Sequence, residues 1–159
     1  FSVPYVHMGG RIGVIVNMEL PAGIEGKDEV VELGKDLAMQ IAAMNPAYRD
    51  KSDVDPSVIE KEKEILMIQA KEDPKNANKP EAIIEKMIMG RVGKFYEENC
   101  LLQQAFVKGD KISVEQHIAE VSKTVGGKIV ITGFTRFEKG EGIEKKQDDF
   151  AAEIASLVQ

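Results

Sequence analysis

The chain has 159 residues, 43% hydrophobic and 30% charged, so it is long enough and apolar enough for one domain with a buried core. Its net charge of −6 argues against general nucleic-acid binding, because phosphate contacts need a basic surface. One cysteine and two histidines exclude an internal disulfide framework and a Cys/His zinc site. No apolar run is long enough to span a bilayer. We expect a soluble protein of a reducing compartment, with no metal, cofactor, nucleic acid or membrane as partner.

Two strands are expected at the start of the chain. The first, residues 3–8, ends at Gly9-Gly10, the kind of residue pair that tight hairpin turns favour. The second, residues 11–19, alternates apolar residues onto one face: Ile12, Val14 and Val16. The pattern predicts an antiparallel β-hairpin.

Three helical segments are predicted in the first two thirds of the chain. Residues 27–44 repeat apolar side chains at spacings of three and four, which is one face of a helix. Residues 55–71 begin with Asp-Pro, a favourable helix start, and residues 80–98 carry a second apolar stripe. The polar segment 73–79 between them predicts an antiparallel helical hairpin, with helices about 27 Å long, that protrudes from the body.

The end of the chain returns to mixed structure. Ser113 and Gln116 have the spacing of a capping box, which predicts a helix to residue 123. Residues 128–138 are rich in β-branched and aromatic side chains and predict a third strand. Residues 148–158 predict a last helix with an apolar face of Phe150, Ile154 and Leu157.

This order of elements predicts an α+β fold. We expect a small three-stranded antiparallel sheet (β-β-α(n)-β) layered with helices, plus the protruding helical hairpin. The chain divides into three expected units: a core subdomain of residues 1–52 and 99–142, the hairpin of residues 53–98, and a C-terminal helix module of residues 143–159.

Both hairpin helices are apolar nearly all round. Two helices can hide only one face each against one another, so the surplus predicts contact with a second copy or a partner. We expect the stripe of Ile84, Ile88 and Val92 to form a homodimer contact. Periodicity alone therefore favours an interaction protein over an enzyme.

Candidate catalytic groups are few. His7 is expected at a strand end, His117 on the surface of a short helix, and Cys100 as a small buried hydrophobe. An enzyme would need these three residues to converge in the fold. The glycine-rich stretches lack the strand-loop-helix order of phosphate-binding loops, so turns explain them.

Four stretches resemble the elongation factor Ts family, whose members exchange guanine nucleotide on elongation factor Tu. They are HMGGRIGVIV, ELGKDLAMQIAAMNP, EKMIMGRVGKFYEENCLLQQAFVK and GFTRFEKGEGIEKKQDDFAAEIA. The resemblance covers essentially the whole chain, in order. It implies a sheet of two strands, helices and a third strand, with an inserted hairpin for self-association. It also implies a cytoplasmic protein, or one of the organellar matrix in a eukaryote.

The resemblance further implies that the chain is the C-terminal half of a family member: the second core half, the hairpin and the C-terminal helix. The family's N-terminal three-helix module is not among these residues, and neither is the Thr-Asp-Phe-Val stretch that disturbs the magnesium and phosphate site of elongation factor Tu. The first residue is Phe1 rather than Met, which is consistent with a fragment or a processed product.

Two contact regions follow from the resemblance. The tip, consisting of His7, Met8, Gly9, Gly10 and Arg11, corresponds to the core edge that meets the third domain of elongation factor Tu. The last helix, with Phe150, Ile154 and Leu157, corresponds to the module that packs on its G domain. We therefore expect a fragment that binds elongation factor Tu and promotes GDP release without catalytic residues. The alternative is a structural dimerisation module without exchange activity.

Overall fold

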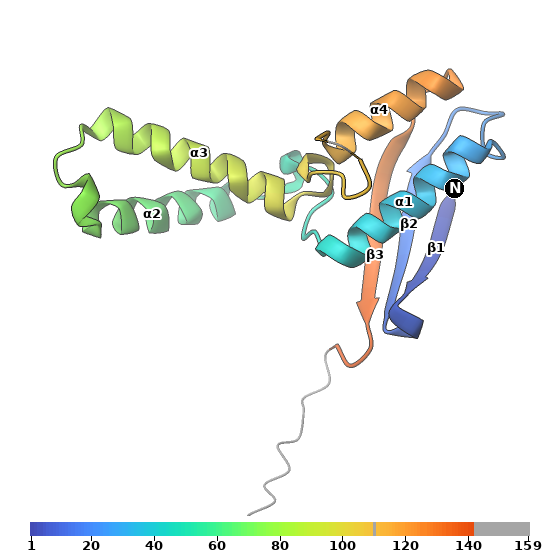
Figure 1. Ribbon diagram of the computed structural model, residues 1–159, viewed down its shortest axis with the longest axis horizontal. Coiled ribbons are helices and arrows are strands. Elements are labelled where there is room, and N and C mark those ends of the chain that lie inside the picture. The colour runs from blue at the N-terminus through green and yellow to red at the C-terminus, as the bar shows by residue number, and fades with distance from the viewer. Residues whose placement is uncertain (110, 142–159) are drawn as a thin grey trace, which may run out of the picture.

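The computed structural model of the chain describes residues 1–109 and 111–141, and Figure 1 shows how their elements are arranged. A sheet and the helices packed on it form a body, and a pair of helices that pack on one another extends away from it. In chain order the strands and longer helices are β1 (Ser2–His7), β2 (Ile12–Glu19), α1 (Asp28–Met44), α2 (Pro56–Glu72), α3 (Glu81–Asn99), α4 (Val114–Val125) and β3 (Val130–Glu138).

The sheet has the strand order β1-β2-β3, and both pairs of neighbours are antiparallel. The first and last strands of the described chain therefore lie on either side of β2. A register irregularity between Asn17 and Met18 interrupts the β2–β3 pairing. The expected α+β class with a three-stranded antiparallel sheet is confirmed.

One face of the sheet is covered by helices, and the core lies there. Side chains of α1 and α4 share one buried cluster with the inward side chains of β2. Gly34 lets α1 approach β1 closely, because a Cβ at this position would lie 2.5 Å from Cγ2 of Val3 and 3.2 Å from the Met18 methyl carbon. The largest fully buried aliphatic side chains include Leu33, Leu37, Ile41, Val14 and Val16.

Local signals in the sequence explain where the helices begin and end. The Asp55 carboxylate accepts a hydrogen bond from the Ser57 amide (2.8 Å) at the start of α2. Ser113 and Gln116 form the expected capping box at the start of α4. Asn45 adopts the left-handed conformation that ends α1. Within the described ranges, no helix has both the length and the apolarity needed to cross a membrane.

The helices α2 and α3 pack on one another and extend from the body (Figure 1). A short turn of 3-10 helix, Pro74–Asn76, connects them. Their buried side chains form a second cluster, separate from the core of the body. We call residues 53–99 the helical hairpin.

A buried amide network ties the end of the hairpin to the body. The Gln40 side chain on α1 donates to Gln104 Oε1 (3.2 Å) and to the Ala105 carbonyl (3.0 Å), and its own oxygen accepts from the Val107 amide (2.9 Å). Gln104 in turn donates to the Glu98 carbonyl (3.0 Å). Both glutamines are fully buried, so their polar groups are satisfied only while this arrangement holds.

A second set of bonds holds the start of the hairpin. The Arg49 guanidinium donates to both oxygens of Asp53 (2.9 and 3.0 Å) and to the Ile131 carbonyl of β3 (3.1 Å). Gln103 donates to Asp50 (2.7 Å). These bonds link the two ends of the hairpin to each other and to the sheet.

Candidate functional site

The connection between β1 and β2 is an exposed and conformationally unusual turn. Met8–Gly10 form one turn of 3-10 helix, and their φ angles are positive: 50° at Met8, 64° at Gly9 and 93° at Gly10. Glycine adopts such angles readily, whereas for methionine they are strained. Met8 nevertheless leaves 61% of its surface exposed. Residues held in strained backbone conformations occur preferentially at functional sites, so the exposed Met8 is a candidate contact residue.

The residues around this turn are held in place by local contacts. The rings of Tyr5 and His7 stack with centroids 5.8 Å apart, and the Tyr5 hydroxyl lies 3.2 Å from His7 Nδ1. The Lys139 amide donates to the Arg11 carbonyl (2.7 Å), which brings the chain after β3 beside the turn. Figure 1 shows the turn and the end of β3 at the same end of the sheet. The tip therefore carries the exposed thioether of Met8, and two cationic residues, Arg11 and Lys139, belong to the same end of the sheet.

The tip departs from the expected geometry by one residue. The sequence predicted a strand to residue 8 and a two-residue turn at Gly9-Gly10, but β1 ends at His7. Met8 cannot continue the strand because its φ is positive. The turn closes when the Arg11 amide donates to the Met8 carbonyl (3.4 Å).

The remaining expected contact residues fall in two places. Phe150, Ile154 and Leu157 lie outside the described residues. Ile84, Ile88 and Val92 lie in the cluster between α2 and α3, where they are only 9%, 5% and 7% exposed. The expected dimerisation stripe thus packs inside the chain's own hairpin, and a contact with another molecule would use other side chains.

The outward face of the hairpin carries those other side chains. Four large apolar residues stand about half exposed or more on α2 and α3: Ile65 (50%), Ile68 (57%), Ile83 (47%) and Met89 (65%). The apolar surplus that the sequence predicted is therefore real. The periodicity of the sequence could not show which apolar side chains stay exposed, because α3 is apolar on both its inner and its outer face.

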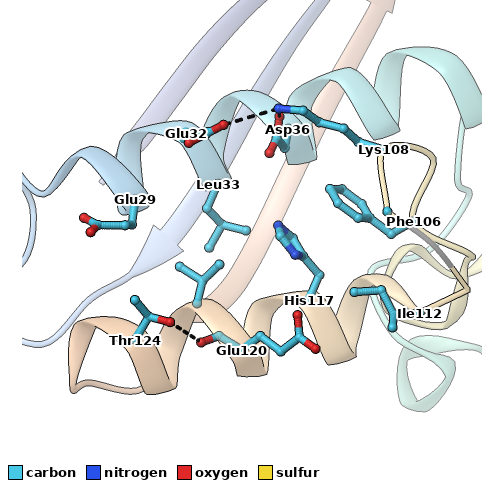
Figure 2. Close-up of a pocket in the computed structure, with 12 residues that line it drawn as sticks. Glu29, Glu32, Leu33, Asp36, Phe106, Lys108, Ile112, His117, Glu120 and Thr124 are labelled. Atoms are coloured by element: carbon cyan, nitrogen blue, oxygen red, sulfur yellow. Dashed lines mark hydrogen bonds and ion pairs between the residues drawn. The ribbon is translucent and has the colours of Figure 1, made fainter.

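A pocket of about 420 Å³ lies between α1, α4 and the segment before α4 (Figure 2). The Phe106 and His117 rings stack there, with centroids 4.1 Å apart and planes 14° from parallel. Lys108 forms ion pairs with Asp36 (3.0 Å) and Glu32 (3.3 Å), and hydrogen bonds from Lys108 to these carboxylates raise the pKa of its ammonium group. His117, which the sequence placed at the surface of a short helix, lines this pocket and is half-buried against Phe106.

The possible catalytic groups do not converge. His7 contacts Tyr5 at the tip, His117 stacks on Phe106, and Cys100 is fully buried in the hairpin cluster. Burial raises the pKa of the Cys100 thiol, which disfavours the reactive thiolate, and the charges of nearby Asp50 and Asp53 act in the same direction. The expectation of a small buried cysteine is confirmed. In the part of the chain that the structure describes, no group of three or more His, Cys, Asp or Glu side chains could hold a metal ion.

Comparison with known proteins agrees with the sequence pattern. The family description Elongation factor TS matches residues 1–141. Elongation factor Ts of Clostridium kluyveri is 47% identical over 156 residues, which is 98% of this chain and 48% of that protein. Elongation factor Ts of Clostridium botulinum is 47% identical over 151 residues, which is 94% of this chain and 47% of that protein.

These matches show the family of the chain and how much of its relatives' length it spans. The fold is an α+β domain with a three-stranded antiparallel sheet, and the turn between β1 and β2 carries the sequence HMGGR. The chain belongs to the elongation factor Ts family. It spans about half the length of the curated relatives it matches.

Proposed function

We propose that this chain is a binding module of the translation machinery whose partner is elongation factor Tu. Family membership supports this partner, and the observation that carries the contact site is the tip. There Met8 is exposed on a strained backbone, and backbone hydrogen bonds join Met8 to Arg11 and Arg11 to Lys139. A turn whose backbone is already constrained loses less entropy on association than a flexible loop.

The expected action on nucleotide is indirect. A partner that binds elongation factor Tu more tightly without GDP than with it must weaken GDP binding by the same factor. Such a partner needs no nucleotide pocket and no catalytic residue. This fits a chain whose candidate catalytic groups lie apart, with Cys100 buried.

How strongly the chain accelerates GDP release should depend on whether it contains the exchange motif of the family. The resemblance associates the Thr-Asp-Phe-Val stretch with disturbance of the magnesium and phosphate site, and this stretch does not occur in the 159 residues. We therefore expect binding with little acceleration of GDP release. Release of a fluorescent GDP analogue should run near its spontaneous rate at saturating chain, and a strong acceleration would contradict this division of roles.

Two matched methionine variants test the tip. Met8→Ala removes a 61% exposed side chain from the tip, and Met89→Ala removes a 65% exposed side chain from the hairpin. Calorimetric titration with elongation factor Tu should show roughly tenfold weaker binding for Met8→Ala, the range of an interface residue worth about 1.4 kcal/mol. Met89→Ala should bind like the parent chain. Equal affinities for all three proteins would exclude Met8 as a contact.

The second contact region is tested by truncation. A chain that ends at Lys146 lacks Phe150, Ile154 and Leu157, which the resemblance places in contact with the G domain. We expect it to keep the melting temperature of the parent and to bind elongation factor Tu more weakly. A fall of the melting temperature by many degrees would instead make this segment part of the chain's own core.

Self-association through the hairpin is a second candidate function. The exposed residues Ile68 and Met89 favour it, whereas Ile88 is buried within the hairpin. A charge at the buried position of Ile88 would unfold the hairpin. The suitable variants are therefore at the exposed positions: Ile68→Lys and Met89→Lys. Sedimentation should show a smaller species for these variants if the hairpin carries the contact.

A further inference from the structure

The pocket between α1 and α4 carries an excess of negative charge. Glu29, Glu32 and Asp36 line it from α1, and Glu120 lines it from α4 (Figure 2). Lys108 supplies the one cationic side chain among the described lining residues, so the lining has a net charge of −3 when its histidine is neutral. A cavity with this charge attracts a cationic ligand.

The wall between these carboxylates is apolar, which bears on the kind of cation. Leu33 lines the pocket from α1, Val121 lines it from α4, and Phe106 and Ile112 line it from the chain before α4. A metal ion prefers a shell of oxygen ligands, and no three His, Cys, Asp or Glu side chains in the described ranges are grouped to hold one. An organic cation, in contrast, can bury its methylene groups on such a wall. The lining therefore favours an organic cation.

The structure already holds an ammonium group in this pocket. Lys108 Nζ lies 3.0 Å from Asp36 Oδ1 and 3.3 Å from Glu32 Oε1, although the Lys108 side chain is 49% exposed. Asp36 is only 9% exposed, and its other carboxylate oxygen accepts no hydrogen bond from the described part of the chain. A carboxylate this buried costs free energy when its oxygens are not all paired. Asp36 can therefore accept a second cationic donor.

The spacing of the carboxylates favours a linear ligand. Glu29, Glu32 and Asp36 are three and four residues apart, so they follow one side of α1 at intervals of about one helical turn, 5.4 Å. In a linear polyamine, about three or four methylene groups separate successive nitrogens, which at ordinary bond lengths is also about 5–6 Å. The repeat of charge along the helix thus matches the repeat of charge along such a ligand.

We propose that this pocket binds a linear aliphatic polyamine. Its ammonium groups lie against the carboxylates of α1 and against Glu120, and its methylene segments lie on Leu33 and Val121. The cavity volume of about 420 Å³ is within the range of small-molecule sites, about 300–1,000 Å³. This site is separate from the tip and from the hairpin, so the proposal does not depend on binding to elongation factor Tu.

The experiment compares two cations of the same charge. Calorimetric titration of the full 159-residue chain with spermidine, at neutral pH and fixed ionic strength, should show one site. Hexaamminecobalt(III) also carries three positive charges but has no methylene groups, so it should bind at least about tenfold more weakly. Equal affinities would mean general attraction to an acidic chain and would overturn the proposal. Tighter binding of trilysine than of spermidine would assign the pocket to a basic peptide and would overturn it as well.

Variants with unchanged fold locate the site. Glu29→Gln and Glu120→Gln should each weaken spermidine binding by about threefold, the value of one exposed ion pair. Glu64→Gln, at an exposed position of α2, is the matched control and should bind like the parent chain. If Glu64→Gln weakens binding as much as Glu29→Gln, the pocket is not the site. Melting temperatures of all variants should equal that of the parent, because these three glutamates are exposed.

Two further variants separate the shape of the pocket from its charge. Thr124 is exposed on the pocket lining, so Thr124→Trp places a large side chain in the cavity without changing charge and should weaken spermidine binding by about tenfold. Lys108→Met removes the competing ammonium from Asp36 and should tighten binding by about threefold. A Thr124→Trp variant that binds like the parent, or a Lys108→Met variant that binds more weakly, would overturn the proposal.

Discussion

The body and the hairpin bury their apolar side chains in different ways. In the body, α1 and α4 close over the sheet, and residues such as Leu37 and Ile41 are fully buried. In the hairpin, two helices face each other alone, and even the innermost residue of α3, Ile88, keeps 5% of its surface exposed. The apolar residues on the outer side of the hairpin have no partner in the described chain.

This difference indicates that the two regions have different stabilities. Two isolated helices bury little apolar area, so the hairpin depends on its attachment to the body. That attachment is polar, through the buried glutamines and the Arg49–Asp53 pair. Regions with few buried apolar contacts open at lower free energy than the global transition. We expect the hairpin to open locally while the body remains folded.

Truncation of one buried aliphatic residue in each region gives the largest contrast. Leu37→Ala should lower the free energy of global unfolding by about 3–5 kcal/mol. Ile88→Ala should lower the opening free energy of the hairpin by about 2–3 kcal/mol and leave the body largely unchanged. Denaturant unfolding with residue-resolved hydrogen exchange checks both. If Ile88→Ala increases exchange equally in α1 and in α3, the two regions unfold as one unit.

The junction between the regions is tested at Gln104. Gln104→Ala leaves the Glu98 carbonyl without its side-chain donor and removes one of the two acceptors of Gln40 Nε2, at a cost of about 1–3 kcal/mol. Hydrogen exchange should increase at the C-terminal end of α3 and in the segment that follows it. Gln69→Ala, at an exposed position of α2, is the matched control and should change little.

Replacing two glycines by alanine should change the stability of the chain in opposite directions. Gly34→Ala puts a Cβ 2.5 Å from Val3 at the helix–sheet contact and should destabilise the body by about 1–3 kcal/mol. Gly90 lies on the exposed side of α3, where an added Cβ would meet no atom within 4 Å, so Gly90→Ala should stabilise the hairpin by about 0.5–1 kcal/mol. Thermal unfolding of both variants measures the signs. A stabilising Gly34→Ala would mean that α1 shifts freely on the sheet.

The helix and strand boundaries could be predicted from the sequence because their causes are local. For the described strands and α-helices, each observed boundary lies within two residues of the expected one. Caps such as Ser113 with Gln116 act over a few residues, and the apolar period is read directly from the chain. The position of the tip could be predicted for the same reason, since its glycines indicate a turn.

The partners of each apolar face could not be predicted, because they are set by tertiary packing. Ile88 belongs to the same helical stripe in the sequence whether that stripe faces α2 or another molecule. His117 is half-buried only because the segment containing Phe106 folds beside α4. The exposed apolar residues on the sheet face opposite α1 and α4 were missed as well. The signal was present in Ile15 and Phe137, apolar residues on the side of their strands that should face water.

The smallest expected effect is a difference in pH dependence between the two regions. At the base of the hairpin, the hydrogen bond from Arg49 lowers the pKa of Asp53. Burial opposes a similar change at Asp50, but hydrogen bonds from Ser52 and Gln103 outweigh it and lower its pKa. A lowered carboxyl pKa gives stability that is present above the ordinary value of about 3.9 and is lost as the pH falls through the folded value.

The body responds at the other end of the pH scale. The raised pKa of Lys108 gives stability that is present below the ordinary value of about 10.4 and is lost as the pH rises through the folded value. Both effects should be small, because these groups are largely exposed to solvent. Melting temperatures from about pH 2.5 to 11.5 should show a flatter acid limb for Asp53→Asn and a flatter alkaline limb for Lys108→Met. Each variant is the control for the other. If Asp53→Asn alters the alkaline limb as much as the acid limb, the hairpin base and the body do not titrate as separate regions.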